Sequence, residues 1–116
     1  MTYTQMVRKI NTAGAWFVGV FMGEFLHGYP QYHQDVASRT AFIQYIHQEY
    51  GVNLNYTYDS TKTKCYALMS LIENRMVIQA LDHVLHCNET RIGKEPMENA
   101  RKLKAAIQQG SVKLPQ

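Results

Sequence analysis

The chain contains little cysteine and little charge, and it has no apolar run long enough to cross a membrane comfortably. Two cysteines among 116 residues, Cys65 and Cys87, cannot make a disulfide framework, so we expect both as reduced, small apolar side chains. Charged residues make up 18% and apolar residues 46% of the sequence, which are globular rather than disordered values. We therefore expect one domain, residues 1–116, whose core needs neither disulfide nor metal.

The sequence also lacks targeting features. Residues 1–11 have no basic flank that leads directly into an apolar core, and no small-residue cleavage site follows. The most apolar run, AGAWFVGVFMGEFL at residues 13–26, contains Glu24 and is shorter than the roughly 20 residues that a membrane span requires. We expect a cytoplasmic protein without a membrane partner.

Catalytic signatures are absent as well. The chain has no G-x-S-x-G elbow, no cysteine in a recognisable catalytic setting, and no glycine pattern of the phosphate-binding or dinucleotide-binding kind. These absences predict a protein that is not an enzyme and binds no cofactor.

Apolar residues recur mainly at helical spacing, which predicts an all-α fold. The expected helices cover residues 4–26, 35–50, 60–87 and 96–109, where the second begins at either Asp35 or Ser38 and the long third helix lies at the centre of a compact bundle. Gly28 and Pro30 are expected to end the first helix. Residues 52–58, VNLNYTY, alternate apolar and polar side chains, but no second such run could pair with them, so an extended loop is predicted.

Three small residues lie four positions apart in the first predicted helix. Ala15, Gly19 and Gly23 would form a shallow face where another backbone approaches closely. Each interior glycine costs a helix about 1 kcal/mol relative to alanine, so two of them suggest a packing requirement. We expect helix packing within the fold there, with a homodimer seam as the alternative.

Two patterns could hold a metal, but each is incomplete. The segment 82-DHVLHC-87 puts His83, His86 and Cys87 at helical spacing, yet a structural zinc site needs four ligands. Glu24 and His27 form a single Glu-x-x-His pair, whereas di-iron bundles use two such pairs. The sequence predicts no metal site.

Tyrosine is the most informative residue type that is present. Seven of the eight tyrosines fall between Tyr29 and Tyr66, and two loop-like runs carry pairs of them, Tyr29 with Tyr32 and Tyr56 with Tyr58. A tyrosine has an apolar ring and a polar tip, which suits a surface that is wet when alone and covered when bound.

Basic charge gathers in the C-terminal half. Residues 1–58 are neutral, whereas residues 59–116 hold nine Lys and Arg against six Asp and Glu. Lys62 and Lys64 follow the Tyr56/Tyr58 loop, and Arg101 and Lys102 lie on the fourth predicted helix. Cations beside stacking aromatics suit single-stranded nucleic acid, although such lysines are commonly just a solvated face.

The leading hypothesis is a small protein-binding module that acts without catalysis. An adaptor or stoichiometric inhibitor, of the kind that mobile genetic elements often encode, fits this size. Its unidentified protein partner would meet the four tyrosines named above, with the basic residues near the rim. The alternative is a nucleic-acid-binding protein that uses the basic C-terminal half and its tyrosines.

Overall fold

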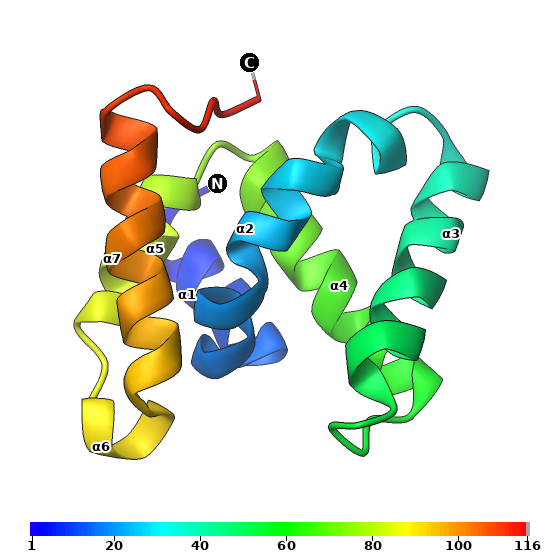
Figure 1. The fold of residues 1–116 in the computed structure, drawn as a ribbon, viewed down its shortest axis with the longest axis horizontal. Coiled ribbons are helices and arrows are strands. Elements are labelled where there is room, and N and C mark those ends of the chain that lie inside the picture. The colour runs from blue at the N-terminus through cyan, green and yellow to red at the C-terminus, as the bar shows by residue number, and fades with distance from the viewer. Residues whose placement is uncertain (116) are drawn as a thin grey trace.

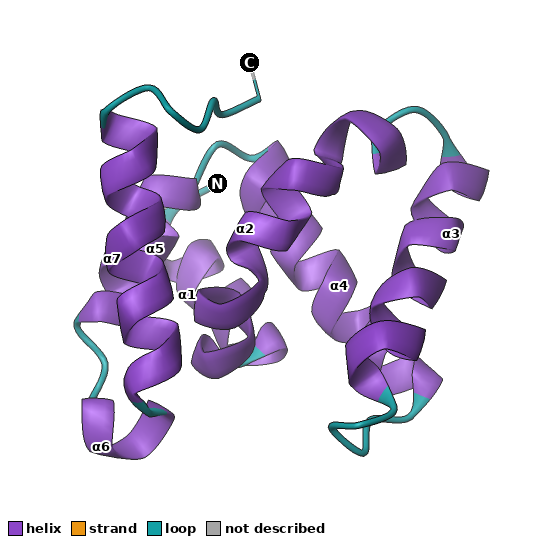
Figure 2. Cartoon of the chain, in the orientation of Figure 1, coloured by secondary structure: helices purple, strands orange, loops and turns teal. Residues whose placement is uncertain are grey.

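The computed structural model describes residues 1–115, and its regular structure is entirely helical (Figure 2). This confirms the all-α class, but there are more helices than the four expected. Over the described residues the elements are α1 (Tyr3–Ala13), α2 (Ala15–Tyr32), α3 (Val36–Ile46), the π-helical turn η1 (His47–Gly51), α4 (Tyr58–Glu73), α5 (Val77–Leu85), α6 (Glu89–Ile92) and α7 (Lys94–Gln108).

The first predicted helix is two helices, so the prediction of one continuous helix over residues 4–26 is wrong. Gly14 separates α1 from α2 with a φ of 92°, a value that glycine adopts without the strain other residues suffer. The ammonium of Lys64 on α4 donates a hydrogen bond of 3.0 Å to the carbonyl oxygen of Ala13, which satisfies a free acceptor at the end of α1.

The predicted stop at Gly28 and Pro30 is also wrong, because α2 continues to Tyr32. Gly28 is needed for packing rather than for a turn, since a Cβ atom there would overlap the ring of Phe42. Pro30 lies within the last turn of α2. The next helix, α3, begins after Asp35, whose side chain caps it by accepting a 2.7 Å hydrogen bond from the Ser38 backbone N–H.

The prediction of one long third helix over residues 60–87 is also wrong. The chain breaks between α4 and α5, where Arg75 adopts a left-handed φ of 60° and the Asn74 side chain donates a 2.8 Å hydrogen bond to the Ser70 carbonyl oxygen. Apolar residues continue at helical spacing through the break, because α4 and α5 both face the core. Periodicity alone therefore could not reveal the interruption.

Residues 52–58 form no strand, but the predicted extended loop is wrong: residues 52–55 make consecutive turns in which Asn55 has a left-handed φ of 61°, and Tyr58 begins α4. They follow η1, in which Gly51 is tightly enclosed: a Cβ there would lie 2.6 Å from both His47 Nδ1 and Thr61 Oγ1. A 2.8 Å hydrogen bond joins those two side chains and ties η1 to the first turn of α4. Residues 52–57 are thus a connection that starts with turns and is held between η1 and α4.

Helix α2 lies between the other elements, with α7 on one side, α3 on the other and α4 behind (Figure 1). Its core face carries Phe17, whose ring lies tilted to that of Phe21 at 4.7 Å and edge to face with that of Phe25 at 6.0 Å between centroids. The molecule measures 33 × 32 × 26 Å. None of the helices within residues 1–115 has both the length and the apolar character required to cross a bilayer.

Candidate functional site: the α2 groove and the Glu24 pocket

One face of α2 is left open between α7 and the η1 region. Two depressions of about 320 and 290 Å³ lie along it and share Val20 on their floor. We call this surface the α2 groove. Its principal residues are Trp16, Val20 and Gly23 on α2, Leu54 after η1, and Asn99 and Leu103 on α7.

The α2 side of the groove is largely apolar. Trp16 is only half-buried there, and its ring meets that of Phe21 edge to face at 6.0 Å. Gly23 is exposed, and a Cβ added at this position would meet no atom within 4 Å. The groove is therefore open along about two turns of α2, although half of the residues of this helix are buried.

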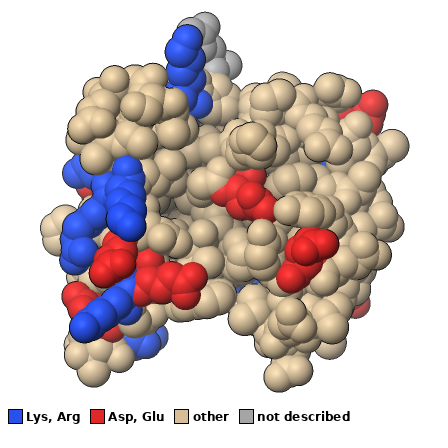
Figure 3. All heavy atoms as spheres, viewed as in Figure 1, with Lys and Arg blue, Asp and Glu red and all other residues tan. Residues whose placement is uncertain are grey.

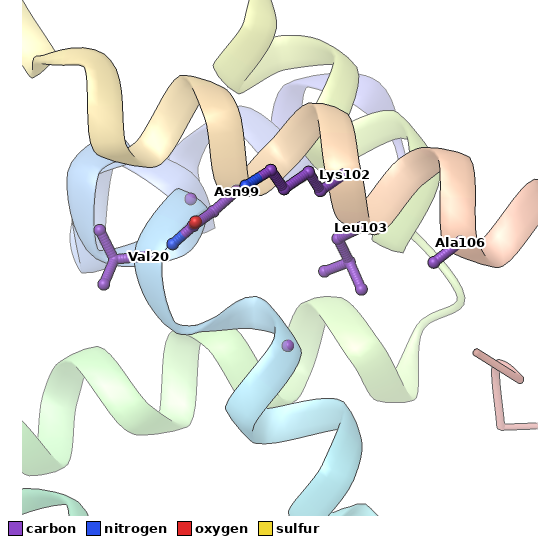
Figure 4. Close-up of a pocket in the computed structure, with 7 residues that line it drawn as sticks. Val20, Asn99, Lys102, Leu103 and Ala106 are labelled. Atoms are coloured by element: carbon purple, nitrogen blue, oxygen red, sulfur yellow. The ribbon is translucent and has the colours of Figure 1, made fainter. Parts of the chain in front are cut away.

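Helix α7 forms the opposite wall. Leu103 points from α7 into the space beside α2, and Asn99 reaches toward the turn of α2 that carries Val20 (Figure 4). Lys102 lies at the rim. This wall combines an apolar residue with two polar ones, an arrangement suited to a contact that has an apolar centre and a wet edge.

A second pocket, which we call the Glu24 pocket, adjoins the groove between α2 and α3. It measures about 340 Å³, and Glu24, His27, Gln31, Phe42 and Tyr45 are among its lining residues. Its position follows from α2, which presents Glu24 one residue after Gly23, and from α3, which brings Tyr45 across from the other side.

Two tyrosine hydroxyls orient the carboxylate in this pocket. Tyr45 and Tyr50 donate hydrogen bonds of 2.9 and 3.0 Å, and both end on Glu24 Oε1. The hydrogen bond to Glu24 raises the pKa of Tyr45, and burial followed by the same partner raises the pKa of Tyr50. Both hydroxyls therefore remain protonated donors, and the carboxylate is held in place while its second oxygen stays available.

Charge is unevenly distributed over this face. Basic side chains gather over α7, with acidic ones among them at its lower end, whereas separate acidic groups lie toward α3 and η1 (Figure 3). Glu49 and Glu95 line the same depression as Trp16. Across residues 1–115 the ion pairs are Arg39–Glu73 and Lys104–Asp82, so none of the three glutamates around the groove has a basic partner.

The structure separates the predicted tyrosines. Tyr32 has 0% exposure and packs among core aromatics, so it offers no surface to a partner. This corrects its assignment: the end of α2 is helical rather than a loop, and it turns this side chain inward. Tyr29 is half-buried and stacks on His33 at 4.5 Å. Tyr56 precedes α4, and Tyr58 is the first residue of that helix and is 37% exposed.

The predicted basic residues are separated too. Lys64 donates to Ala13 and lies 5.1 Å from the Tyr56 ring centre, so it serves as a packed structural cation. Lys62 lies 5.9 Å from the ring of the exposed Tyr66 on the same helix. Arg101 and Lys102 are exposed on α7, apart from α4.

The small-residue stripe does not form one seam. Gly19 is buried against α7, where an added Cβ would lie 2.6 Å from Pro96 Cβ. Gly23 faces the open groove, and Ala15 lines a separate cavity of about 510 Å³ with Cys87 and Arg91. The close approach at Gly19 is thus made within the chain.

The histidine and cysteine candidates have local partners. Cys87 donates weakly to the His83 carbonyl at 3.4 Å, His83 lies 3.4 Å from the Tyr3 hydroxyl, and the ring of His86 contacts the Asp82 carbonyl at 2.6 Å. Over the described part of the chain, no three His, Cys, Asp or Glu side chains converge in a way that could hold a metal ion.

Sequence reasoning missed the most organised polar group, Tyr45 and Tyr50 on Glu24. No local signal marks it, because Glu24 is 21 and 26 residues away from the two tyrosines. The exposed Tyr66 was also missed, although its four-residue spacing from Lys62 was visible in the sequence.

The sequence matches no protein-family model, and neither a curated protein nor a solved structure matches the chain.

Proposed function

We propose that this chain is a protein-binding domain, acting as an adaptor or stoichiometric inhibitor without catalysis, and that its partner docks in the α2 groove. The observation that carries the proposal is the half-buried Trp16 beside Val20 on a groove floor walled by α7 and η1. The core side chains of this bundle are at most 8% exposed, whereas the groove leaves an apolar floor open beside Trp16, the single tryptophan of the sequence, which favours a binding role.

The composition of the groove supports this proposal. Tryptophan and tyrosine are the residue types most enriched at the energetic centres of protein interfaces, and Trp16 and Tyr50 both line the same depression. Asn99 and Lys102 supply a polar rim on the α7 side. The proposed surface thus uses Tyr50 beside Trp16 and Tyr45 in the Glu24 pocket, in place of the tyrosines expected from the sequence.

A second candidate function has its own observation. Tyr58, Lys62 and Tyr66 are all exposed and recur every four residues, so they share one face of α4. Two aromatic rings with a cation between them suit the stacking of bases in single-stranded nucleic acid. This face belongs to α4 rather than to the α2 groove, so variants can separate the two functions.

The test uses a residue that can block the groove without disturbing the core. Gly23→Trp adds a large side chain at an exposed helical position with open space around it, and Gly23→Ala is the matched control. Each protein is used to capture partners from a lysate of its source cells, with and without nuclease, after circular dichroism confirms folding.

We expect Gly23→Ala to retain a nuclease-resistant protein partner and Gly23→Trp to lose it. If both retain the partner, the α2 groove is not its binding site. If the captured material is nuclease-sensitive and is lost in a variant with alanine at Tyr58, Lys62 and Tyr66, the nucleic-acid function replaces the proposed one. Light scattering on each variant reports whether the partner is a second copy of this chain.

A further inference from the structure

We infer that the segment received by the α2 groove is a positively charged amphipathic helix, and that one of its arginine or lysine side chains ends on Glu24. This inference rests on the proposed function, since it names the chemistry of the partner at the same surface. It adds a requirement that protein binding alone does not make: the partner must be basic.

The shape of the groove fits a helix. Trp16, Val20, Gly23 and His27 follow one another at spacings of four, three and four residues, so they lie along one face of α2. Eleven residues of helix rise about 16 Å, which is the length of three helical turns. A partner helix laid along this face would lie between α7 and η1 and bury its apolar stripe on Val20 and Trp16.

The sign of the charge comes from three carboxylates. Glu49 and Glu95 border the depression at Trp16, and Glu24 borders the next pocket along α2. Both ion pairs found in residues 1–115 involve other acids, Glu73 and Asp82. A helix that covers the groove removes water from these carboxylates, and basic side chains on its flanks would offset that desolvation.

Glu24 is the one of the three that is prepared for a specific contact. The hydroxyls of Tyr45 and Tyr50 both donate to Oε1, which fixes the carboxylate, and neither of them uses Oε2. The rings of Phe42 and Tyr45, with centroids 6.0 Å apart, form aromatic lining in the same pocket. An arginine or lysine can hydrogen-bond to the carboxylate there while its apolar stem packs on the rings.

The charges along α7 give the complex a direction. Glu95 borders the depression at Trp16, whereas Lys102, seven residues later on the same helix, borders the depression at Gly23. A partner helix with a basic residue opposite Glu95 and an acidic residue opposite Lys102 would match both charges, and turning that helix end for end would bring like charges together.

The test uses a phage-displayed library of 18-residue peptides. Leucines are fixed at helical spacing in every peptide, and the remaining positions are randomised among Arg, Lys, Asp, Glu, Gln and Ala. The library is selected on the parent protein after depletion on Gly23→Trp. Winning peptides are synthesised and titrated against the parent, Glu24→Gln and Glu89→Gln, with the emission of Trp16, the only tryptophan, as the readout of occupancy. Glu89 lies on α6 and makes the charge-matched control.

We expect the selected peptides to be enriched in Arg and Lys, to bind the parent about tenfold more tightly than Glu24→Gln, and to bind Glu89→Gln as they bind the parent. Selection of acidic or neutral peptides, or equal affinity for Glu24→Gln, would overturn the inference and leave the groove as a protein-binding site. If no peptide binds the parent better than Gly23→Trp, the helix-binding inference fails as well. The lysate capture then decides the proposed function by itself.

Discussion

The two glycines of α2 provide the sharpest test of the packing, because alanine at each should change stability in opposite directions. Both lie inside the same helix, so Gly19→Ala and Gly23→Ala gain the same helical preference, about 0.5–1 kcal/mol. Neither has a positive φ that would penalise a side chain. Only their surroundings differ.

At Gly19 the new methyl group would meet Pro96 at three atoms. Its position lies 2.6 Å from Cβ, 3.0 Å from Cα and 3.0 Å from the carbonyl oxygen of that residue. Two of these atoms are backbone and the third belongs to a rigid ring, so no side-chain rotation relieves the overlap and α7 must shift. Overpacking of this kind typically costs about 1–3 kcal/mol, which exceeds the helical gain. We expect a net loss of about 1–2 kcal/mol for Gly19→Ala.

At Gly23 the methyl group enters open space, so the helical gain remains, and Gly23→Ala should raise the free energy of unfolding by about 0.5–1 kcal/mol. Urea unfolding followed by circular dichroism measures both variants against the parent. At unchanged m-values, the urea midpoint should fall for Gly19→Ala and rise for Gly23→Ala. If Gly19→Ala is as stable as Gly23→Ala, then α2 and α7 do not approach as closely as described.

Other consequences of the packing can be measured with single substitutions. Tyr32→Phe should leave the free energy of unfolding unchanged or raise it by up to about 1 kcal/mol, because the buried Tyr32 hydroxyl has no hydrogen-bond partner. A measurable loss of stability would reveal such a partner. Burial raises the pKa of Tyr32 above its ordinary 10, so the protonated side chain contributes fully to stability below pH 10 and that contribution is lost as the pH rises further. Between pH 8 and 11, the free energy of unfolding should therefore decline less in Tyr32→Phe than in the parent. Truncating the half-buried Trp16 to alanine should cost less than the roughly 3–5 kcal/mol expected for the fully buried Phe25→Ala, and equal losses would place Trp16 in the core. Burial raises the pKa of the Cys65 thiol to about 12, so iodoacetamide should modify Cys87 first in the native protein; mass spectrometry showing early modification of Cys65 would contradict its burial.

The sequence by itself determined the helical class and most of the local stops. Apolar residues at helical spacing predicted the all-α fold, and Pro96 and Gly110 located the last helix to within two residues of α7. Of the two starts expected for the second helix, Asp35 and Ser38, Asp35 is the residue that caps α3. These features depend on backbone geometry within one turn of chain, so neighbouring residues are sufficient to specify them.

The tertiary structure alone decided which side chains meet. Glu24 meets Tyr45 and Tyr50 because α3, which packs beside α2, carries Tyr45 and continues into η1, which carries Tyr50; no spacing in the sequence encodes these contacts. Tyr32 was read as a surface residue because tyrosine is compatible with either environment; its burial was decided by the inward-facing end of α2. Gly19 and Gly23 belong to the same pattern of small residues, yet Pro96 packs on one and leaves the other at the groove. Periodicity specifies the face of a helix, whereas the partner of each face depends on how distant helices pack, and that arrangement exists only in the folded chain.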